Sequence, residues 1–490
     1  MKVAFRADAA VDLGTGHVMR CLALADRLRE AGARTCFLCR PLDGHLGQRI
    51  AARGYGLVWL PLREDLAQDA EDSRAALAPD APWDWLVVDH YGLDARWESA
   101  LRGVAGRILA IDDLADRPHD CDLLLDQNLQ DPGRYDGRVP AGCRPLLGPR
   151  YALLRPQFAA ARKTLRPREG RVARLLVFFG GTDPGGETLK ALEAIRRLNR
   201  SDLAVDVVVG EANPHRAAIE AACRALPQAT LHGQVEDMAA RMAAADLFVG
   251  AGGTSSWERC CLGLPALVLA TADNQVAQSQ ALARAGAQVY LGPSSGVGPE
   301  PLAHWITALI SAPEWLAHMA EQGMRLVDGG GCARVGDHLL ADAIRLRRAR
   351  AEDCQQIHAW RNHPDTRRHA RDPAPIEYAA HERWFAQVLA DPDRELLVAE
   401  QDGRPLGVLR YDIRAGVGSV SIYLVPGLAG QGWGRRVLLA AERWLEVERP
   451  DVTVCEAEVL AENAPSLALF QMAGFRPHRI TFRKDCHARG

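Results

Sequence analysis

The sequence predicts an α/β protein in which two doubly wound parallel sheets precede a smaller, mixed α/β domain. Short apolar runs alternate with helical stretches, and this alternation occurs twice, in residues 1–155 and again in residues 172–340. Unbroken apolar runs are typical of parallel strands that helices cover on both faces. Residues 345–490 differ, because two of their predicted strands meet at a tight turn over Asp402–Gly403.

Each predicted strand of the first two domains is an apolar run that precedes a helical stretch. In the first domain the runs are KVAFRA, RTCFLC, LVWLPL, WDWLVVDH and RILAIDD; in the second they are RLLVFFGG, LAVDVVVG, ADLFVGAGG, PALVLA and AQVYLG. The polar, Arg-rich stretch 155–171 is expected to connect the two. Two such domains that face each other would place their strand-end loops on one ligand.

The third domain has a different order of predicted elements. A strand enters a helix over IRLRRARAEDCQQIHAWRN, and LLVAEQDGRPLGVLRYDI contains two strands joined by the turn. Further strands are GSVSIYLVP and VTVCEAEVLAEN, with helices over RRVLLAAERWLE and APSLALFQMAGF. This order predicts a mixed sheet with helices between its strands.

Composition and charge exclude several classes of protein. The chain has 490 residues with 59 basic and 62 acidic side chains, a formal charge of −3. This near balance argues against a protein that mainly neutralises nucleic-acid phosphates. No apolar run approaches the roughly 20 residues of a membrane span, and Arg6 and Asp8 make the first residues a strand rather than a leader. We therefore expect a cytoplasmic protein that binds neither nucleic acid nor membrane.

The twelve cysteines are too few for a disulfide scaffold and do not pair by spacing. Cys36 and Cys39 form one C-x-x-C, which leaves a zinc or redox role open. No second pair or histidine cluster accompanies it, so buried thiols in and beside a strand are the favoured interpretation. No metal site is expected.

A glycine-rich turn, Gly14-Thr15-Gly16-His17, follows the first predicted strand and opens the first helix. Glycines permit a tight turn and close approach of a ligand to the backbone. His17 falls near the helix N-terminus, where the helix dipole disfavours the imidazolium form. A neutral imidazole at the edge of a cleft can act as a general base. A role for His17 in capping the helix is an equal alternative.

A second glycine-rich turn runs from Gly250 to Glu258, again between a strand and a helix. Exposed N–H groups at such a turn bind phosphate, and Thr254 or Ser255 can cap the helix or donate to phosphate. Glu258 lies one turn further on, where it can accept hydrogen bonds from a ribose or act as the carboxylate of a capping box. Gly180-Gly181-Thr182-Asp183 is another strand-end loop that would line the same cleft.

Three stretches of residues 1–340 together resemble the UDP-sugar hydrolase family of pseudaminic acid biosynthesis. They are FRADAAVDLGTGHVMRCLALA, VEDMAARMAAADLFVGAGGTSSWERCCLGLPALVLATADNQ and DGGGCARV. That family removes UDP from UDP-2,4-diacetamido-2,4,6-trideoxy-β-L-altropyranose and is similar to GT-B glycosyltransferases, which have two Rossmann-like domains, notably the muramyl N-acetylglucosaminyl transferase. The resemblance therefore implies a GT-B-like fold and an inverting hydrolase.

The same resemblance implies roles for individual residues. His17 would be the catalytic base, with the Gly14 and Gly16 turn, Tyr91 and Asn274 near the sugar. The diphosphate would lie on Gly252, Gly253, Thr254 and Ser255, the ribose on Glu258, and the uracil on the backbone of Val235–Met238. For Tyr91, simple packing at a strand end is an equal alternative.

In the third domain, the run Gly427-Leu428-Ala429-Gly430-Gln431-Gly432-Trp433-Gly434-Arg435 between a strand and a helix forms a pyrophosphate cradle. This run, Asn463-Ala464-Pro465-Ser466 and LFQMAGF resemble the GNAT N-acetyltransferases. The resemblance implies acetyl-CoA as co-substrate, bound by Leu424, Gly430, Gln431, Gly432, Trp433, Gly434, Arg435 and Asn463.

Two positions depart from the GNAT pattern. Ala429 stands where that family usually has Arg or Gln, a mild loss because backbone amides perform most of the binding. Phe470 stands where many members have the Tyr that protonates the departing thiolate. Glu456, Glu458 and His381 are alternative groups for moving the amine proton, and nothing in the sequence selects among them.

The combined prediction is a bifunctional enzyme of pseudaminic acid synthesis. The GNAT domain would acetylate the 4-amine of a UDP-sugar, and the first two domains would hydrolyse the product to UDP and free sugar. The alternatives are a UDP-sugar glycosyltransferase fused to an acetyltransferase, and a nucleotide-sugar-binding regulator without turnover.

Overall fold

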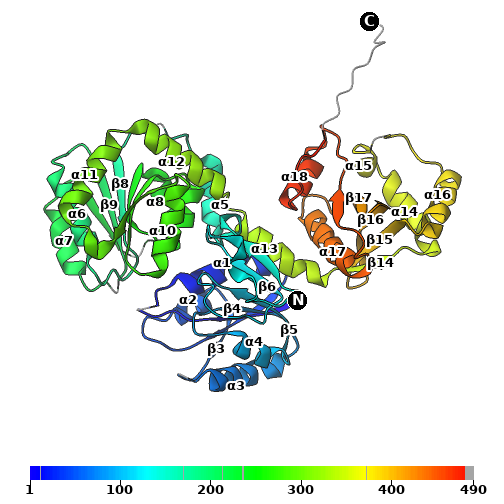
Figure 1. Cartoon of the computed structure of the whole chain (residues 1–490), viewed down its shortest axis with the longest axis horizontal. Helices are drawn as coiled ribbons and strands as arrows, with labels where there is room; N and C mark the ends of the chain where they lie inside the picture. The colour runs from blue at the N-terminus through cyan, green and yellow to red at the C-terminus, as the bar shows by residue number, and fades with distance from the viewer. Residues whose placement is uncertain are drawn as a thin grey trace, which may run out of the picture. The chain divides into compact units, whose positions relative to one another are not determined.

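The computed structural model describes residues 1–479 except 12, 64, 169, 212, 234, 236 and 371. It divides into two compact units, Met1–Gly336 and Asp337–Gly490. The first unit holds two parallel sheets and the second a mixed sheet (Figure 1). The predicted fold class is confirmed. In the part of the chain that is described, no helix has the length and apolar character that crossing a membrane requires.

The first sheet has seven parallel strands in the order β3-β2-β1-β4-β5-β6-β7. Its strands are β1 (Lys2–Ala7), β2 (Arg34–Cys39), β3 (Gly56–Trp59), β4 (Trp83–Asp89), β5 (Ala105–Ile111), β6 (Leu123–Asp126) and β7 (Arg144–Leu147). Its helices are α1 (Gly16–Glu30), α2 (Gly47–Ala52), α3 (Leu66–Leu77) and α4 (Ala95–Leu101), and α5 (Pro156–Thr164) follows. The inner strands β1, β4, β5 and β6 are largely buried on both faces, which explains their unbroken apolar runs, whereas the edge strands β3 and β7 are partly exposed.

The second sheet has six parallel strands in the order β10-β9-β8-β11-β12-β13. They are β8 (Arg174–Phe178), β9 (Ala204–Val209), β10 (Ala229–Gly233), β11 (Leu247–Ala251), β12 (Ala266–Ala270) and β13 (Val289–Pro293). The helices are α6 (Glu187–Arg197), α7 (Arg216–Arg224), α8 (Met238–Ala244), α9 (Ser255–Cys261), α10 (Asn274–Arg284), α11 (Pro299–Ile310), α12 (Pro313–Leu326) and α13 (Gly331–Leu340). One core lies under α6, α7 and α11, and another under α5, α8, α9 and α10.

Three edge or near-edge strands, β6, β7 and β10, were not predicted from the sequence. β6 and β7 have four residues each and β10 has five, and Pro145 lies within β7. Proline cannot donate to a β-ladder, so it is tolerated at the edge of a sheet but weakens the sequence signal.

Both sheets reverse their strand order next to their first strand, between β1 and β4 and between β8 and β11. Loops at the carboxyl ends of strands beside such a reversal form the crevice in which doubly wound sheets bind ligands. The predicted site segments follow these strands: Gly14–His17 after β1, Tyr91 after β4 and Gly252–Ser255 after β11. The topology therefore places each of these segments at the carboxyl edge of its own sheet, beside the reversal of strand order.

The second unit contains a five-stranded sheet in the order β14-β15-β16-β17-β18. Its elements are β14 (Arg345–Arg348), β15 (Arg394–Gln401), β16 (Arg404–Arg414), β17 (Val417–Leu424), β18 (Val454–Glu456), α14 (Cys354–Asn362), α15 (Pro364–Arg367), α16 (Tyr378–Ala390), α17 (Trp433–Glu448) and α18 (Ala464–Met472). The predicted hairpin turn is confirmed, because Asp402 and Gly403 have φ angles of +50° and +76° between paired residues Gln401 and Arg404.

The last strand of this sheet is shorter than predicted. The run VTVCEAEVLAEN forms only three strand residues, and β18 pairs in parallel with Val417–Ser419 of β17. β17 continues to Leu424, beyond this pairing. The two strands thus separate on the side where the glycine-rich run leaves β17.

The structure places the start of the second unit at Asp337, before the predicted start at residue 345. Asp337 is buried and pairs with two buried arginines of α17, Arg435 at 3.3 Å and Arg436 at 3.1 Å. A fragment that begins at residue 345 would leave both guanidinium groups without this carboxylate.

We expect a fragment of residues 345–490 to be less stable than one of residues 337–490 by about 3 kcal/mol, the usual cost of removing one partner of a buried ion pair. Urea unfolding measures the difference. Asp337→Ala in the longer fragment should reproduce most of the loss, and equal midpoints for the three proteins would show that the pair does not stabilise this unit.

Candidate functional site

A buried ion-pair cluster holds His17 at the carboxyl edge of the first sheet. His17 is the second residue of α1, and its Nδ1 lies 2.6 Å from Oδ1 of Asp89, the last residue of β4. Arg20, one helical turn after His17, donates from Nε and Nη2 to the two oxygens of Asp89, at 2.6 and 2.7 Å. The His17 and Asp89 side chains are 9% and 0% exposed.

The charge of Asp89 determines which imidazole nitrogen carries a proton. Burial alone would raise the pKa of Asp89, but the charges of Arg20 and His17 outweigh it and hold that pKa well below its usual range. An ionised carboxylate only accepts hydrogen bonds, so Nδ1 of His17 must donate. In the neutral ring the lone pair is then on Nε2, the form that a general base requires.

A second chain of contacts links this cluster to the other half of the first unit. Tyr91 donates from its hydroxyl to Asp113 at 3.3 Å, and Asp113 lies 3.4 Å from Arg20. Asn274, the first residue of α10, donates from Nδ2 to the Tyr91 hydroxyl at 3.3 Å. The rings of Tyr91 and His17 also pack in a T-shaped arrangement, with centroids 4.6 Å apart. Burial, followed by the charge of Asp113, raises the pKa of Tyr91.

The structure therefore brings together three of the predicted site residues, His17, Tyr91 and Asn274. Tyr91 does more than pack at a strand end. Its hydroxyl donates to Asp113, in a loop of the first sheet, and accepts from Asn274, at the start of the helix that follows β12 of the second sheet. The contact between Asn274 and Tyr91 is one link between the two halves at the site, and no sequence spacing predicts it.

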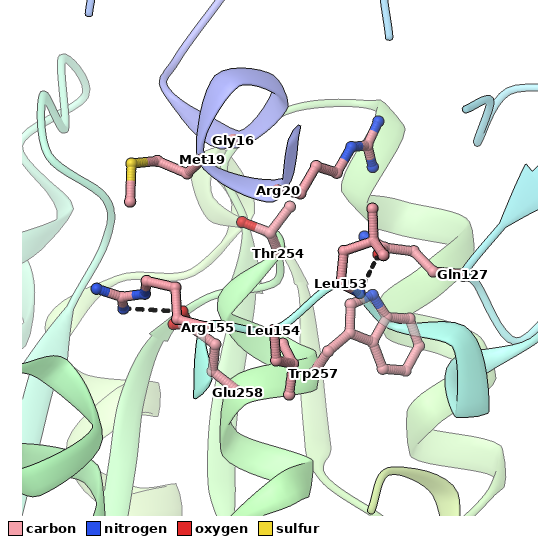
Figure 2. Close-up of a pocket in the computed structure, with 10 residues that line it drawn as sticks. All are labelled: Gly16, Met19, Arg20, Gln127, Leu153, Leu154, Arg155, Thr254, Trp257 and Glu258. Carbon is pink, nitrogen blue, oxygen red and sulfur yellow. Dashed lines mark hydrogen bonds and ion pairs between the residues drawn. The ribbon is translucent and has the colours of Figure 1, made fainter. Parts of the chain in front are cut away.

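The glycine-rich turns of the two halves also meet. A Cβ on Gly16 would lie 3.4 Å from Cγ2 of Thr254, so a larger residue at position 16 would press on the opposite turn. A small pocket opens beside this contact (Figure 2). Gly16, Met19, Arg20, Gln127, Leu153, Leu154, Arg155, Thr254, Trp257 and Glu258 line it.

Glu258 faces this pocket and binds Arg155 across it, with 3.0 Å between Arg155 Nη2 and Glu258 Oε1 (Figure 2). Thr254 is the N-cap of α9, so Glu258 is the fourth helical residue and not the third, and the capping-box alternative for Glu258 is wrong. Burial raises the pKa of Glu258, and the charge of Arg155 opposes that shift. The pocket thus pairs a desolvated carboxylate with a cation.

The predicted uracil segment is only partly described. Glu236 lies outside the described residues, and the Asp237 side chain accepts a hydrogen bond from the Ala240 amide at the start of α8. Met238 is buried in the core and does not line the pocket. Its assignment to the base remains a prediction.

Sequence reasoning missed Asp89, Arg20, Asp113 and Arg155. Asp89 and Asp113 follow apolar runs, and carboxylates at strand ends are a signal that could have been used. Arg20 lies three residues after His17, on the same helical face. Arg155 carries no such signal, because its partner Glu258 is more than a hundred residues away.

In the second unit, the glycine-rich run forms a turn at the start of α17. Gly430 and Gly432 have φ angles of +78° and +80°, which residues with a Cβ rarely adopt. Gln431 donates to the Gly427 carbonyl at 3.0 Å. α17 begins at Trp433, so its first N–H groups point into the turn.

Three other predicted cofactor residues, Gly434, Arg435 and Asn463, make contacts within the protein. A Cβ on Gly434 would lie 3.4 Å from Leu469 and 4.0 Å from Leu424, so the helix passes close to the end of β17. Arg435 is buried against Asp337, which leaves its backbone N–H rather than its guanidinium for a diphosphate. Asn463 caps α18 by accepting from the Ser466 amide at 3.1 Å.

The position usually held by a tyrosine is part of the core. Phe470 is 8% exposed and packs on Phe475. Among the three alternative groups, Glu456 and Glu458 are exposed, whereas His381 is buried beside Trp384 and Phe385 on α16. Phe470 itself has no proton to give.

Two facing parallel sheets of Rossmann type, with strand-end loops that meet, define a fold of the GT-B type. Residues 343–476 match the acetyltransferase (GNAT) domain family, so the chain joins a GT-B-type part to a GNAT acetyltransferase domain. A MurG protein from Acinetobacter baumannii has the same fold as the first part, with a TM-score of 0.50, 17% identity, and coverage of 69% of this chain and 99% of that chain.

Two curated relatives match part of the chain. It is 34% identical over 189 residues to the spore coat polysaccharide biosynthesis protein SpsG of Bacillus subtilis, covering 38% of this chain and 56% of SpsG. It is 31% identical over 185 residues to the UDP-2,4-diacetamido-2,4,6-trideoxy-β-L-altropyranose hydrolase of Campylobacter jejuni, covering 37% of this chain and 61% of that protein. The match thus spans less than two thirds of each relative.

Proposed function

We propose that the first unit hydrolyses a UDP-linked 2,4-diacetamido-2,4,6-trideoxy hexose and that the GNAT domain acetylates the 4-amine of its precursor. The observation that carries the hydrolase is the cluster in which ionised Asp89 and Arg20 hold His17 where the two sheets meet. The similarity to the altropyranose hydrolase supports the substrate class.

In the proposed hydrolysis, Nε2 of His17 takes a proton from a water molecule as that water attacks the anomeric carbon. The bond from this carbon to the diphosphate breaks on the opposite face, so the configuration inverts. The amides of Gly252–Ser255 stabilise the charge of the departing UDP. Asp89 stays ionised and stabilises the imidazolium that forms.

In the proposed acetylation, the sugar amine attacks the thioester carbon of acetyl-CoA, the amine loses a proton, and the CoA thiolate leaves. The turn over Gly430–Gly434 and the first amides of α17 would hold the diphosphate of CoA. Because Phe470 cannot protonate the thiolate, another group or water does so.

A single incubation distinguishes the alternatives. The full-length protein is mixed with the UDP-diacetamido sugar and no acceptor, and UDP is measured. We expect UDP and free sugar in equal amounts. UDP that forms only with an added acceptor would indicate a glycosyltransferase, and binding without UDP would indicate a regulator.

The order of the two reactions is also testable. The side-chain amide of Asn274 would hydrogen-bond the 4-acetamido group of the sugar. A site built to bind an acetamide in this way should reject a charged 4-ammonium. We expect no UDP from the 4-amino sugar nucleotide until acetyl-CoA is added. Prompt release without acetyl-CoA would overturn the proposed order.

Glu258→Ala should raise KM about tenfold and leave kcat nearly unchanged, because contacts to a ribose form equally in the ground and transition states. Steady-state kinetics of UDP release measures both constants. Glu193→Ala, at a partly exposed glutamate of α6, is the matched control and should change neither. A large fall in kcat alone would place Glu258 at the reacting centre.

A further inference from the structure

Two cysteines that are far apart in sequence lie side by side at the start of neighbouring strands. Cys121 precedes β6 and Cys143 precedes β7, and their sulfur atoms are 3.6 Å apart. Backbone hydrogen bonds hold them there, because the Arg144 amide donates to the Asp122 carbonyl at 2.9 Å. Side-chain rotations that bring the two sulfurs about 1.5 Å closer would give the bonded distance of roughly 2.05 Å.

We propose that Cys121 and Cys143 form a redox-active dithiol that a peroxide converts reversibly to a disulfide. Cys143 would be the reacting thiolate and Cys121 the resolving thiol. The pair is distinct from the proposed hydrolase site, because it lies at the amino ends of the strands, whereas His17 and Asp89 lie at the carboxyl edge.

The surroundings of the two sulfurs assign these roles. Cys143 is partly exposed, so a small oxidant can reach it, whereas Cys121 is 1% exposed. The hydrogen bond between the two sulfurs lowers the pKa of Cys143, and burial and the carboxylates of Asp122 and Glu98 oppose this shift without reversing it. A thiolate rather than a thiol is the nucleophile toward peroxide.

A buried histidine adds positive charge next to Cys143. Burial alone would lower the pKa of His119, but the carboxylate of Asp112, 3.8 Å from Nε2, and that of Glu98, hydrogen-bonded to Nδ1 at 2.8 Å, outweigh it and raise that pKa to about 9. His119 is therefore cationic at neutral pH, and its charge also lowers the pKa of Cys143.

The steps balance as follows. The Cys143 thiolate attacks one oxygen of hydrogen peroxide, the O–O bond breaks, and a sulfenic acid and hydroxide form. The Cys121 sulfur then attacks the Cys143 sulfur, which expels the sulfenic oxygen as water. Overall, two thiols and one peroxide give one disulfide and two waters, and a small dithiol reverses the reaction.

The C-x-x-C pair is a control within the same chain. Cys36 and Cys39 both lie in β2, where a separation of three residues is roughly 10 Å, too far for a disulfide. Burial raises the pKa of Cys36, and raises that of Cys39 to about 12, so both stay as thiols at neutral pH.

The test uses the reduced full-length protein, equimolar hydrogen peroxide and alkylation of the remaining thiols. Trypsin cleaves after Arg134 and Arg138, which separates the two cysteines, so a disulfide appears as one linked pair of peptides. We expect a Cys121–Cys143 link that dithiothreitol removes. At pH 7, Cys143 should also be alkylated at least tenfold faster than Cys36.

The variants separate the two roles. Cys121→Ser should leave a Cys143 sulfenic acid that dimedone traps, Cys143→Ser should abolish both products, and Cys36→Ser with Cys39→Ser should leave the link unchanged. If the wild-type protein keeps both thiols under peroxide, or links either cysteine to another one, the proposal is wrong.

Discussion

Replacing Asp89 with asparagine should lower the rate of UDP release by about 10²–10⁴-fold, with little change in KM. An asparagine amide can present its NH₂ group to Nδ1 of His17, which favours the tautomer with the proton on Nε2 and removes the base. It also removes the negative charge that pairs with Arg20 and stabilises the imidazolium. Steady-state kinetics with the UDP-diacetamido sugar measures the loss.

Two controls separate this role from a loss of folding. Asp89→Asn should still bind UDP, since neither Asp89 nor His17 lines the pocket beside Thr254 and Glu258, and it should retain acetyl transfer in the other unit. His17→Ala should show a similar loss. The double variant should be no slower than either single variant, because Asp89 acts on the reaction through His17. Additive losses, or near-wild-type UDP release by Asp89→Asn, would contradict the assignment.

Replacing Gly432 with valine should weaken CoA binding by at least a hundredfold, while UDP binding is unchanged. Gly432 has a φ of +80° immediately before α17, so a β-branched residue is strained there and its side chain occupies the turn that would hold the diphosphate. Calorimetric titration with CoA and with UDP measures the two sites in one protein.

The matched control for this variant is Gly403→Val. Gly403 has a φ of +76° in the hairpin turn of the same unit, and no atom lies within 4 Å of the position that a Cβ would take there, so the backbone strain is comparable. Both variants should lose stability, but only Gly432→Val should lose CoA binding. Equal loss of binding in the two variants would show that strain, and not the cradle, explains the effect.

The sequence alone was sufficient for the fold class and for the segments of the candidate site. Apolar runs with glycine-rich turns at their ends are local patterns, and doubly wound topology places such turns at one edge of each sheet. For this reason His17 and Gly252–Ser255 were predicted from the residues themselves, whereas Tyr91 was predicted only from the family resemblance. The hairpin at Asp402–Gly403 was predicted for the same reason, since two residues determine its turn.

Only the tertiary structure decided which side chains act on these segments. Asp89 and Arg20 join His17, Asn274 reaches Tyr91, and Arg155 pairs with Glu258, through contacts between residues remote in the chain. Likewise, Cys121 and Cys143 meet because β6 and β7 are neighbours, whereas the conspicuous C-x-x-C is held apart by its own strand. Sequence patterns report the periodicity of one element, but ion pairs and pKa values depend on burial and on partners that only the packing of several elements brings within 4 Å.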